Sequence, residues 1–157
     1  PSLEVSLNGS SVLDMRYTDS GLWVLGESSL MIVSPKDGSV QTYSFGRSYL
    51  KGYDLSGDGF ALVLLGRYRA GSADQAVTVN AQGEQQAVLS LGGQVLDFSA
   101  GGSYCAVLTG TGLTVYDPDM EQASSMQSTM GARRVDMGAD GTAVLADSQR
   151  AWLYIPG

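Results

Sequence analysis

The chain has 157 residues and a mass of 16.4 kDa, the size of one ordinary domain. It contains no histidine, which excludes imidazole bases, histidine-assisted nucleophiles and histidine-ligated metals. The net charge of -7 argues against nucleic-acid backbones and anionic membrane surfaces as partners. With 43% apolar residues and 21 glycines, the chain can bury a core and is rich in turns.

The first segment, Leu3 to Leu7, alternates apolar and polar residues, which is the pattern of a half-buried strand. It belongs to none of the repeats that follow it. No basic leader or apolar run of membrane length is present, so we expect no membrane contact by these residues themselves.

From residue 8 onward, one phrase recurs: an aspartate between apolar residues, then a glycine turn, then an apolar run. The four aspartates are Asp14, Asp54, Asp97 and Asp136, at steps of 40, 43 and 39 residues. This period is that of a propeller blade made of four short antiparallel strands. The sequence therefore predicts a single all-β domain or part-domain, a β-propeller of about four blades, which could be the C-terminal part of a larger propeller.

The repeat units span about 8–44, 45–90, 91–128 and 129–157. The strands expected, in chain order, are 12–15, 22–25, 30–33 and 40–43; 53–55, 60–65, 76–79 and 86–89; 95–98, 104–108, 113–116 and 123–126; and 135–137, 143–145 and 151–155. The fourth unit lacks an outer strand. We expect 3–7 to supply one, because propellers commonly close by completing one terminal blade with the other terminus.

Two assemblies would achieve this closure. In a closed four-bladed monomer, which we favour, 3–7 reaches the fourth unit of its own chain. In a two-fold dimer, each chain lends 3–7 to the other and an eight-bladed ring results. Alternatively, 3–7 belongs to a preceding blade outside this sequence.

The turn Asp54-Leu55-Ser56-Gly57-Asp58-Gly59-Phe60 resembles the SPDG-type turn of WD-like, YVTN-like and quinoprotein-like propeller repeats. Over about residues 94–157, GGSYCAVLTGTGLTVYDPDMEQ and GARRVDMGADGTAVLADSQRAWLYIPG look like the end of a bacterial propeller family of unknown function. Members of that family carry an N-terminal membrane helix before an extracytoplasmic propeller. The resemblance implies an extracytoplasmic, membrane-tethered protein and supplies no catalytic residues.

Three groups of residues could carry chemistry. The four repeat aspartates could converge on a cation at the propeller axis, but we expect each to fix its own turn. Asp117, Asp119 and Glu121 lack the spacing of a calcium loop. Cys105 lies in an apolar run and is expected to be an inert core residue. We therefore expect no catalytic residue, metal or cofactor.

Charge is expected to separate between the two loop faces of the propeller. Loops that join second to third strands, or one unit to the next, hold seven of the nine basic residues: Arg47, Lys51, Arg67, Arg69, Arg133, Arg134 and Arg150. The other face holds Asp19, Asp37, Asp58, Glu84, Asp117, Asp119, Glu121 and Asp140. The longest loop of the basic face is Gly66 to Gln75, beside Phe45, Tyr49 and Met130. A solvated, unoccupied loop remains an alternative to a contact surface.

These features indicate a non-catalytic binding or scaffolding module at the outer cell surface. The expected binding residues are Arg47, Arg67, Tyr68, Arg69, Arg133 and Arg134, and the expected partner is an acidic protein segment or an anionic glycan. The alternative is a propeller enzyme that acts on carbohydrate or performs a cofactor-dependent oxidation.

Overall fold

The computed structural model describes residue 4, residue 6 and residues 11–157, and the described part folds into four antiparallel sheets. The first sheet contains β1 (Val12–Thr18), β2 (Gly21–Gly26), β3 (Ser29–Val33) and β4 (Val40–Ser44). The second contains β5 (Tyr49–Asp54), β6 (Phe60–Gly66), β7 (Gln75–Asn80) and β8 (Gln85–Ser90). The third contains β9 (Val95–Gly101), β10 (Tyr104–Thr109), β11 (Leu113–Tyr116) and β12 (Gln122–Met126). The fourth contains β13 (Arg134–Met137), β14 (Ala143–Ala146) and β15 (Ala151–Tyr154).

Each sheet is a meander in which consecutive strands pair, so the all-β prediction and the repeat period are confirmed. Every strand expected in 12–155 is present, and the fourth sheet has three strands, as expected. The second strand β6 is apolar and buried along its whole length, because neighbouring sheets cover both of its faces. Gly59 precedes it with φ of 74°, a conformation that glycine adopts without strain.

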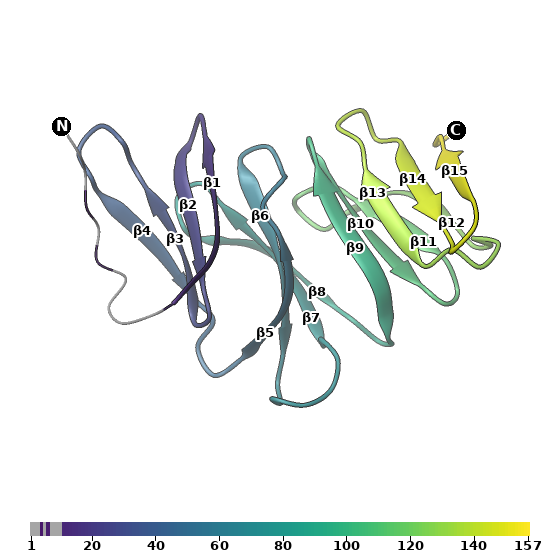
Figure 1. Ribbon diagram of the computed structural model, residues 1–157, viewed down its shortest axis with the longest axis horizontal. Coiled ribbons are helices and arrows are strands. Elements are labelled where there is room, and N and C mark those ends of the chain that lie inside the picture. Colours follow the sequence, from purple (N-terminus) through teal and green to yellow (C-terminus); the bar gives the residue numbers. More distant parts are fainter. Residues whose placement is uncertain (1–3, 5, 7–10) are drawn as a thin grey trace.

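The sheets stand side by side in chain order, from β1–β4 on the left of Figure 1 to β13–β15 on the right. Their first strands, β1, β5, β9 and β13, face the viewer. Because each sheet is a meander, the loops after first and third strands gather at one edge of the molecule, at the top of Figure 1. The remaining loops gather at the opposite edge, as the sequence predicts.

The core lies between the sheets rather than at a common centre. Trp23, Leu25 and Val63 belong to the cluster between the first two sheets. Another cluster, which includes Leu62 and Cys105, joins the second and third sheets, and one with Leu108 and Leu145 joins the third and fourth. Each sheet is therefore held mainly by its immediate neighbours.

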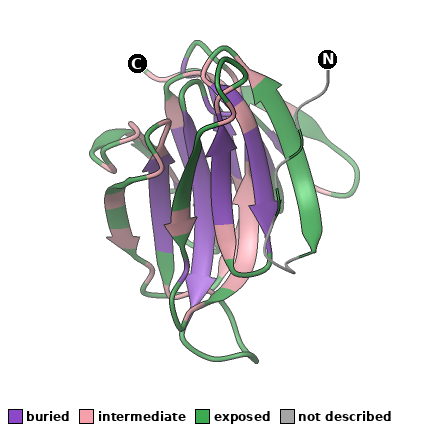
Figure 2. Cartoon of the chain, turned by 90° about the vertical axis from the view of Figure 1, so that its left-hand side faces the viewer, coloured by how far each residue is buried: buried purple, intermediate pink, exposed green. Residues whose placement is uncertain are grey.

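The favoured closed monomer is wrong for the structure seen here, because the sheets do not form a ring. The first and fourth sheets lie at opposite ends of the molecule, and each turns one face away from the other three. Figure 2 looks onto the first of these ends, where the central strands are buried and an edge strand is exposed. Residues 3, 5 and 7 of the expected strand at 3–7 lie outside the described residues, so its closing role stays a prediction.

Among the described residues, no helix is long and apolar enough to cross a membrane.

Candidate functional site

The basic loops meet at the lower edge of the second sheet in Figure 1, where the β4–β5 and β6–β7 loops lie. There, a groove of about 860 Å³ separates them from the β2–β3 loop. Arg47 comes from the β4–β5 loop, Lys51 from β5 and Arg69 from the β6–β7 loop. Three cations from separate parts of the chain thus line one groove.

Two contacts hold the groove in shape. Lys51 Nζ donates a hydrogen bond to the carbonyl oxygen of Arg69 at 2.6 Å, which ties β5 to the long loop. The guanidinium of Arg69 lies 5.7 Å from the ring centre of Tyr49, a favourable cation–π distance. The Arg69 side chain is therefore positioned over an aromatic surface before any partner arrives.

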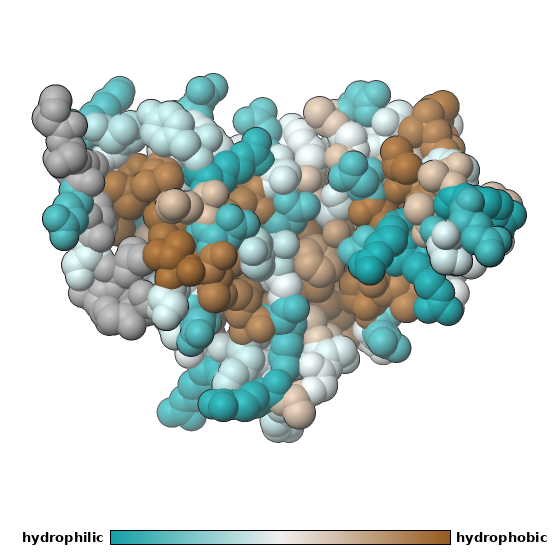
Figure 3. Space-filling view, viewed as in Figure 1, coloured by the Kyte–Doolittle hydropathy of each residue, from teal (hydrophilic) through white to brown (hydrophobic). Residues whose placement is uncertain are grey.

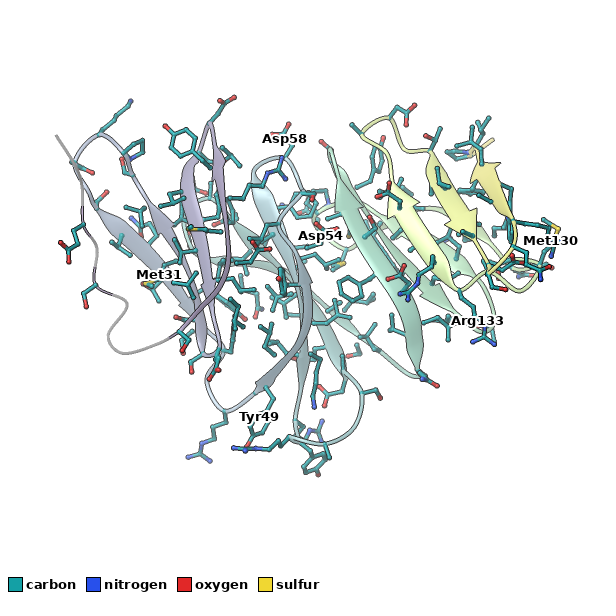
Figure 4. All side chains as sticks on the ribbon, viewed as in Figure 1. Met31, Tyr49, Asp54, Asp58, Met130 and Arg133 are labelled. Atoms are coloured by element: carbon teal, nitrogen blue, oxygen red, sulfur yellow. The ribbon has the colours of Figure 1, made fainter. Side chains whose placement is uncertain are left out.

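The groove also has apolar walls and one acid. Leu13 and Leu50 line it together with Tyr49, which Figure 4 shows at the lower edge of the second sheet. Among the described residues that line it, Glu27 is the one carboxylate. The site therefore combines cationic and apolar surface, which suits an amphipathic anionic chain.

Arg67 and Tyr68 lie in the same loop as Arg69 but do not line the groove. The backbone N–H of Arg67 donates to Asp74 Oδ2 at 2.9 Å, and its Nε lies 4.0 Å from the same oxygen. Asp74 therefore closes the loop and offsets the charge of Arg67. Tyr68 is exposed at the loop surface.

The expected binding residues divide into two groups. Arg133 and Arg134 lie with Leu96, Asp147 and Ser148 around a separate hollow of about 420 Å³, at the third and fourth sheets. Figure 4 shows Arg133 far from Tyr49. Met130 lies near Arg133 in a neighbouring hollow, and Phe45 is buried in the core, so neither contributes to the groove.

The basic face carries more acids than the sequence interpretation assigned to it. Glu27, Asp74 and Asp147 lie in loops between second and third strands. Asp147 accepts from the backbone amides of Gln149 and Arg150, and these bonds, with the Arg150 side chain, hold the pKa of Asp147 below its usual range. The groove is consequently the part of this face where basic residues most exceed acidic ones.

Among the described residues, Asp54 is the one repeat aspartate with a hydrogen bond inside its own turn, so the prediction that each of the four fixes its own turn is wrong for Asp14, Asp97 and Asp136. Asp54 Oδ1 does accept from Ser56 N–H in its own turn at 2.9 Å. Its Oδ2, however, accepts from the Ala100 N–H of the next sheet at 2.8 Å, and Asp97 Oδ2 accepts from the Val135 N–H of the fourth sheet at 2.8 Å. The sequence did not indicate these bonds, because the amides lie about one repeat further along the chain.

Asp14 also points towards the next sheet. Burial, and then the neighbouring Asp14 carboxylate, raise the pKa of Tyr53 in β5. Arg16, two residues after Asp14 in β1, donates a hydrogen bond to the carbonyl oxygen of Leu55 at 2.7 Å and so also connects the first sheet to the second.

Cys105 is a buried core residue in the cluster between the second and third sheets. Burial, and to a lesser degree Asp117, raise its pKa to about 12, so its thiol stays protonated at neutral pH. Asp117 itself accepts from the amides of Asp119 and Glu121 and thereby forms a turn.

Two groove residues, Tyr49 and Lys51, were not among the binding residues that the sequence predicted. Both belong to the basic face, but a register shift between Leu50 and Gly52 interrupts the alternation along β5, so the strand period alone did not place them together. Glu27 had no indication beyond its position in a loop of that face.

No protein-family model and no curated protein matches the sequence. Among solved structures, the chain is similar to the computationally designed Ika4 protein, with a TM-score of 0.65 and 9% identity over 99% of this chain and 96% of that one. It is also similar to the N-terminal domain of Nup159 (TM-score 0.59, 12% identity, 93% of this chain and 46% of that one). The RRP9 WD40 repeats give a TM-score of 0.54 at 8% identity over 82% of this chain and 44% of theirs.

The fold is that of WD40-like propeller repeats. At these identities the likeness extends to the fold alone. The chain spans less than half the length of the Nup159 and RRP9 propeller chains.

Proposed function

We propose that this chain is a non-catalytic binding module that uses the groove between Arg47, Lys51 and Arg69 to hold an acidic protein segment. The convergence of these three cations on one groove carries the proposal. Rigid sheets fix the positions of their loops, and a preorganised loop loses less conformational entropy on binding.

The chemistry of the groove favours a peptide over other anionic partners. Carboxylates would pair with the guanidinium groups, and Arg forms bidentate pairs with carboxylates. Leu13, Leu50 and Tyr49 add apolar surface that the side chains of a peptide would cover and that an anionic glycan would use less. We therefore choose an acidic peptide with interspersed apolar residues as the partner class.

A binding role also fits the shortage of acid–base chemistry in the groove. Glycoside cleavage uses two carboxyl groups across the scissile bond, whereas Glu27 is the one carboxylate among the described lining residues.

The proposal includes an extracytoplasmic, membrane-tethered location, which rests on the sequence resemblance described above. It also takes the four sheets as four consecutive blades of a propeller. Cell fractionation with an antibody against the native protein tests the location, and recovery in the soluble cytoplasmic fraction would contradict it.

The binding test uses a fluorescein-labelled peptide of glutamate and leucine and measures its anisotropy. The double variant Arg47→Glu/Arg69→Glu should weaken binding at least about tenfold, because it places two carboxylates beside the anionic peptide. The control, Arg133→Glu/Arg134→Glu, makes the same change of net charge in the separate hollow and should weaken binding by less than about twofold.

Equal losses in the two variants would show that net charge and not the groove determines binding. A sulfated oligosaccharide serves as the second probe, and tighter binding of that probe than of the peptide would overturn the choice of partner.

A further inference from the structure

The joints between sheets repeat one arrangement. In each of the first three sheets, the repeat aspartate pairs across the strands with a leucine of the second strand: Asp14 with Leu25, Asp54 with Leu62, and Asp97 with Leu108. These three leucines are fully buried, and each belongs to the cluster shared with the following sheet. Aspartate and leucine therefore mark the face on which the next sheet packs.

The fourth sheet has the same face with no sheet on it. Asp136 pairs with Val144, and Val144 pairs with Leu153, so the three form one row across the sheet. Val144 is 43% exposed, Leu153 56% and the nearby Ile155 66%, whereas the leucines in equivalent rows are at 0%. Asp136 accepts no hydrogen bond among the described residues, although Asp54 and Asp97 each accept an amide of the next sheet.

The first strand of the first sheet shows the opposite half of such a joint. In the fourth sheet, Val135 and Met137 of the innermost strand are buried against the third sheet. In the first sheet, Met15 and Tyr17 occupy the corresponding face of β1 and are 62% and 69% exposed, whereas Val24 and Met31, in the same row as Met15, are buried. The exposed part of this face therefore follows β1. The space-filling view shows apolar side chains at both ends of the molecule, over β1 and over the fourth sheet (Figure 3).

We propose that a second copy of this chain covers both ends, with the fourth sheet of each copy packed along β1 of the other. A two-fold axis would then form the same joint twice. In each joint, Asp136 would accept an amide of the partner's β1, and Val144 and Leu153 would be buried against its Met15 and Tyr17.

Two observations favour a second copy as the occupant. The match to the Nup159 domain spans 93% of this chain but only 46% of that domain, so two copies together supply about the length of that domain. At the existing joints, the polar contacts run between the first strands of neighbouring sheets. Among these first strands, β1 is the one that is exposed along almost its whole length. Both halves of the joint are thus present on one chain.

The first test is the mass of the intact chain by sedimentation velocity, which should be twice 16.4 kDa. The variant Leu153→Arg/Ile155→Arg should sediment as a monomer, with the dissociation constant raised at least about a hundredfold because each charge would be buried in both joints. The control Val88→Arg changes a residue of similar exposure to Val144 on the outer strand β8 and should remain dimeric.

A charge-swap experiment identifies the two faces. The variant Met15→Asp/Tyr17→Asp should also be a monomer, and mixing it with Leu153→Arg/Ile155→Arg should restore the dimer. In that mixture one joint is native and the other places aspartates against arginines. Circular dichroism spectra that match the parent chain would show that each variant is folded.

Three results would overturn the proposal. These are a monomeric parent chain across the accessible concentrations, a dimer that survives the β1 substitutions, or a mixture of the two folded variants that stays monomeric. The result of the peptide-binding test is independent, because none of these substitutions lies in the groove.

Discussion

At the residue scale, the carboxylates of Asp54 and Asp97 connect one sheet to the next. Each accepts a hydrogen bond from a partly buried backbone N–H of the following sheet. Removing such an acceptor leaves a partly buried N–H unsatisfied, which costs more free energy than the bond contributes.

The substitution Asp97→Ala should therefore lower the free energy of unfolding by about 1–3 kcal/mol, because the Val135 N–H loses its acceptor at the joint between the third and fourth sheets. Urea unfolding monitored by tryptophan fluorescence measures the loss. Asp19→Ala, at an exposed turn position, should change stability by less than about 0.5 kcal/mol. Equal effects would mean that the inter-sheet bond contributes nothing.

The second prediction at this scale concerns Cys105, whose pKa is raised to about 12 by burial and then by Asp117. The native thiol should not react with an aromatic disulfide reagent at mildly alkaline pH, and should react fully in denaturant. Because the folded pKa exceeds the ordinary value of 9.0, this group favours folding fully below pH 9 and loses that contribution between pH 9 and 12. Rapid labelling of the native protein would contradict the assignment.

At the element scale, the sequence predicted the strands because each apolar run is bounded by glycine and preceded by aspartate. It did not predict the bonds between sheets, because the Asp97 carboxylate and the Val135 amide are 38 residues apart and no local pattern links them. The sequence also predicted Arg69 as a binding residue. It did not predict the contact of Arg69 with Lys51, because that contact depends on how the long loop folds back on β5. Sequence patterns thus located the elements, and tertiary packing determined the site.

Close packing between elements is clearest at Gly101, where an added methyl group would overlap the carbonyl oxygen of Met137. Gly101→Ala should force the third and fourth sheets apart and lower the free energy of unfolding by about 1–3 kcal/mol. Gly110→Ala is the matched control, since nothing lies within 4 Å of its added methyl group. Urea titration of both variants checks this, and equal stabilities would show that the joint is looser than described.

At the scale of the whole molecule, the meanders place acidic turns on one edge and basic loops on the other. Figure 4 shows Asp58 at the upper edge and Tyr49, beside the groove, at the lower edge. A chain with a net charge of -7 thereby presents a cationic groove to one side, where an anionic partner can approach.

Hydrogen–deuterium exchange with and without the saturating glutamate–leucine peptide tests this account most directly, because it locates the bound peptide on the molecule. The account predicts slower exchange in residues 46–51 and 67–74, with the turns around Asp58 and Asp119 unchanged. Protection at those acidic turns, or at the hollow beside Arg133, with none at the two groove segments would contradict it.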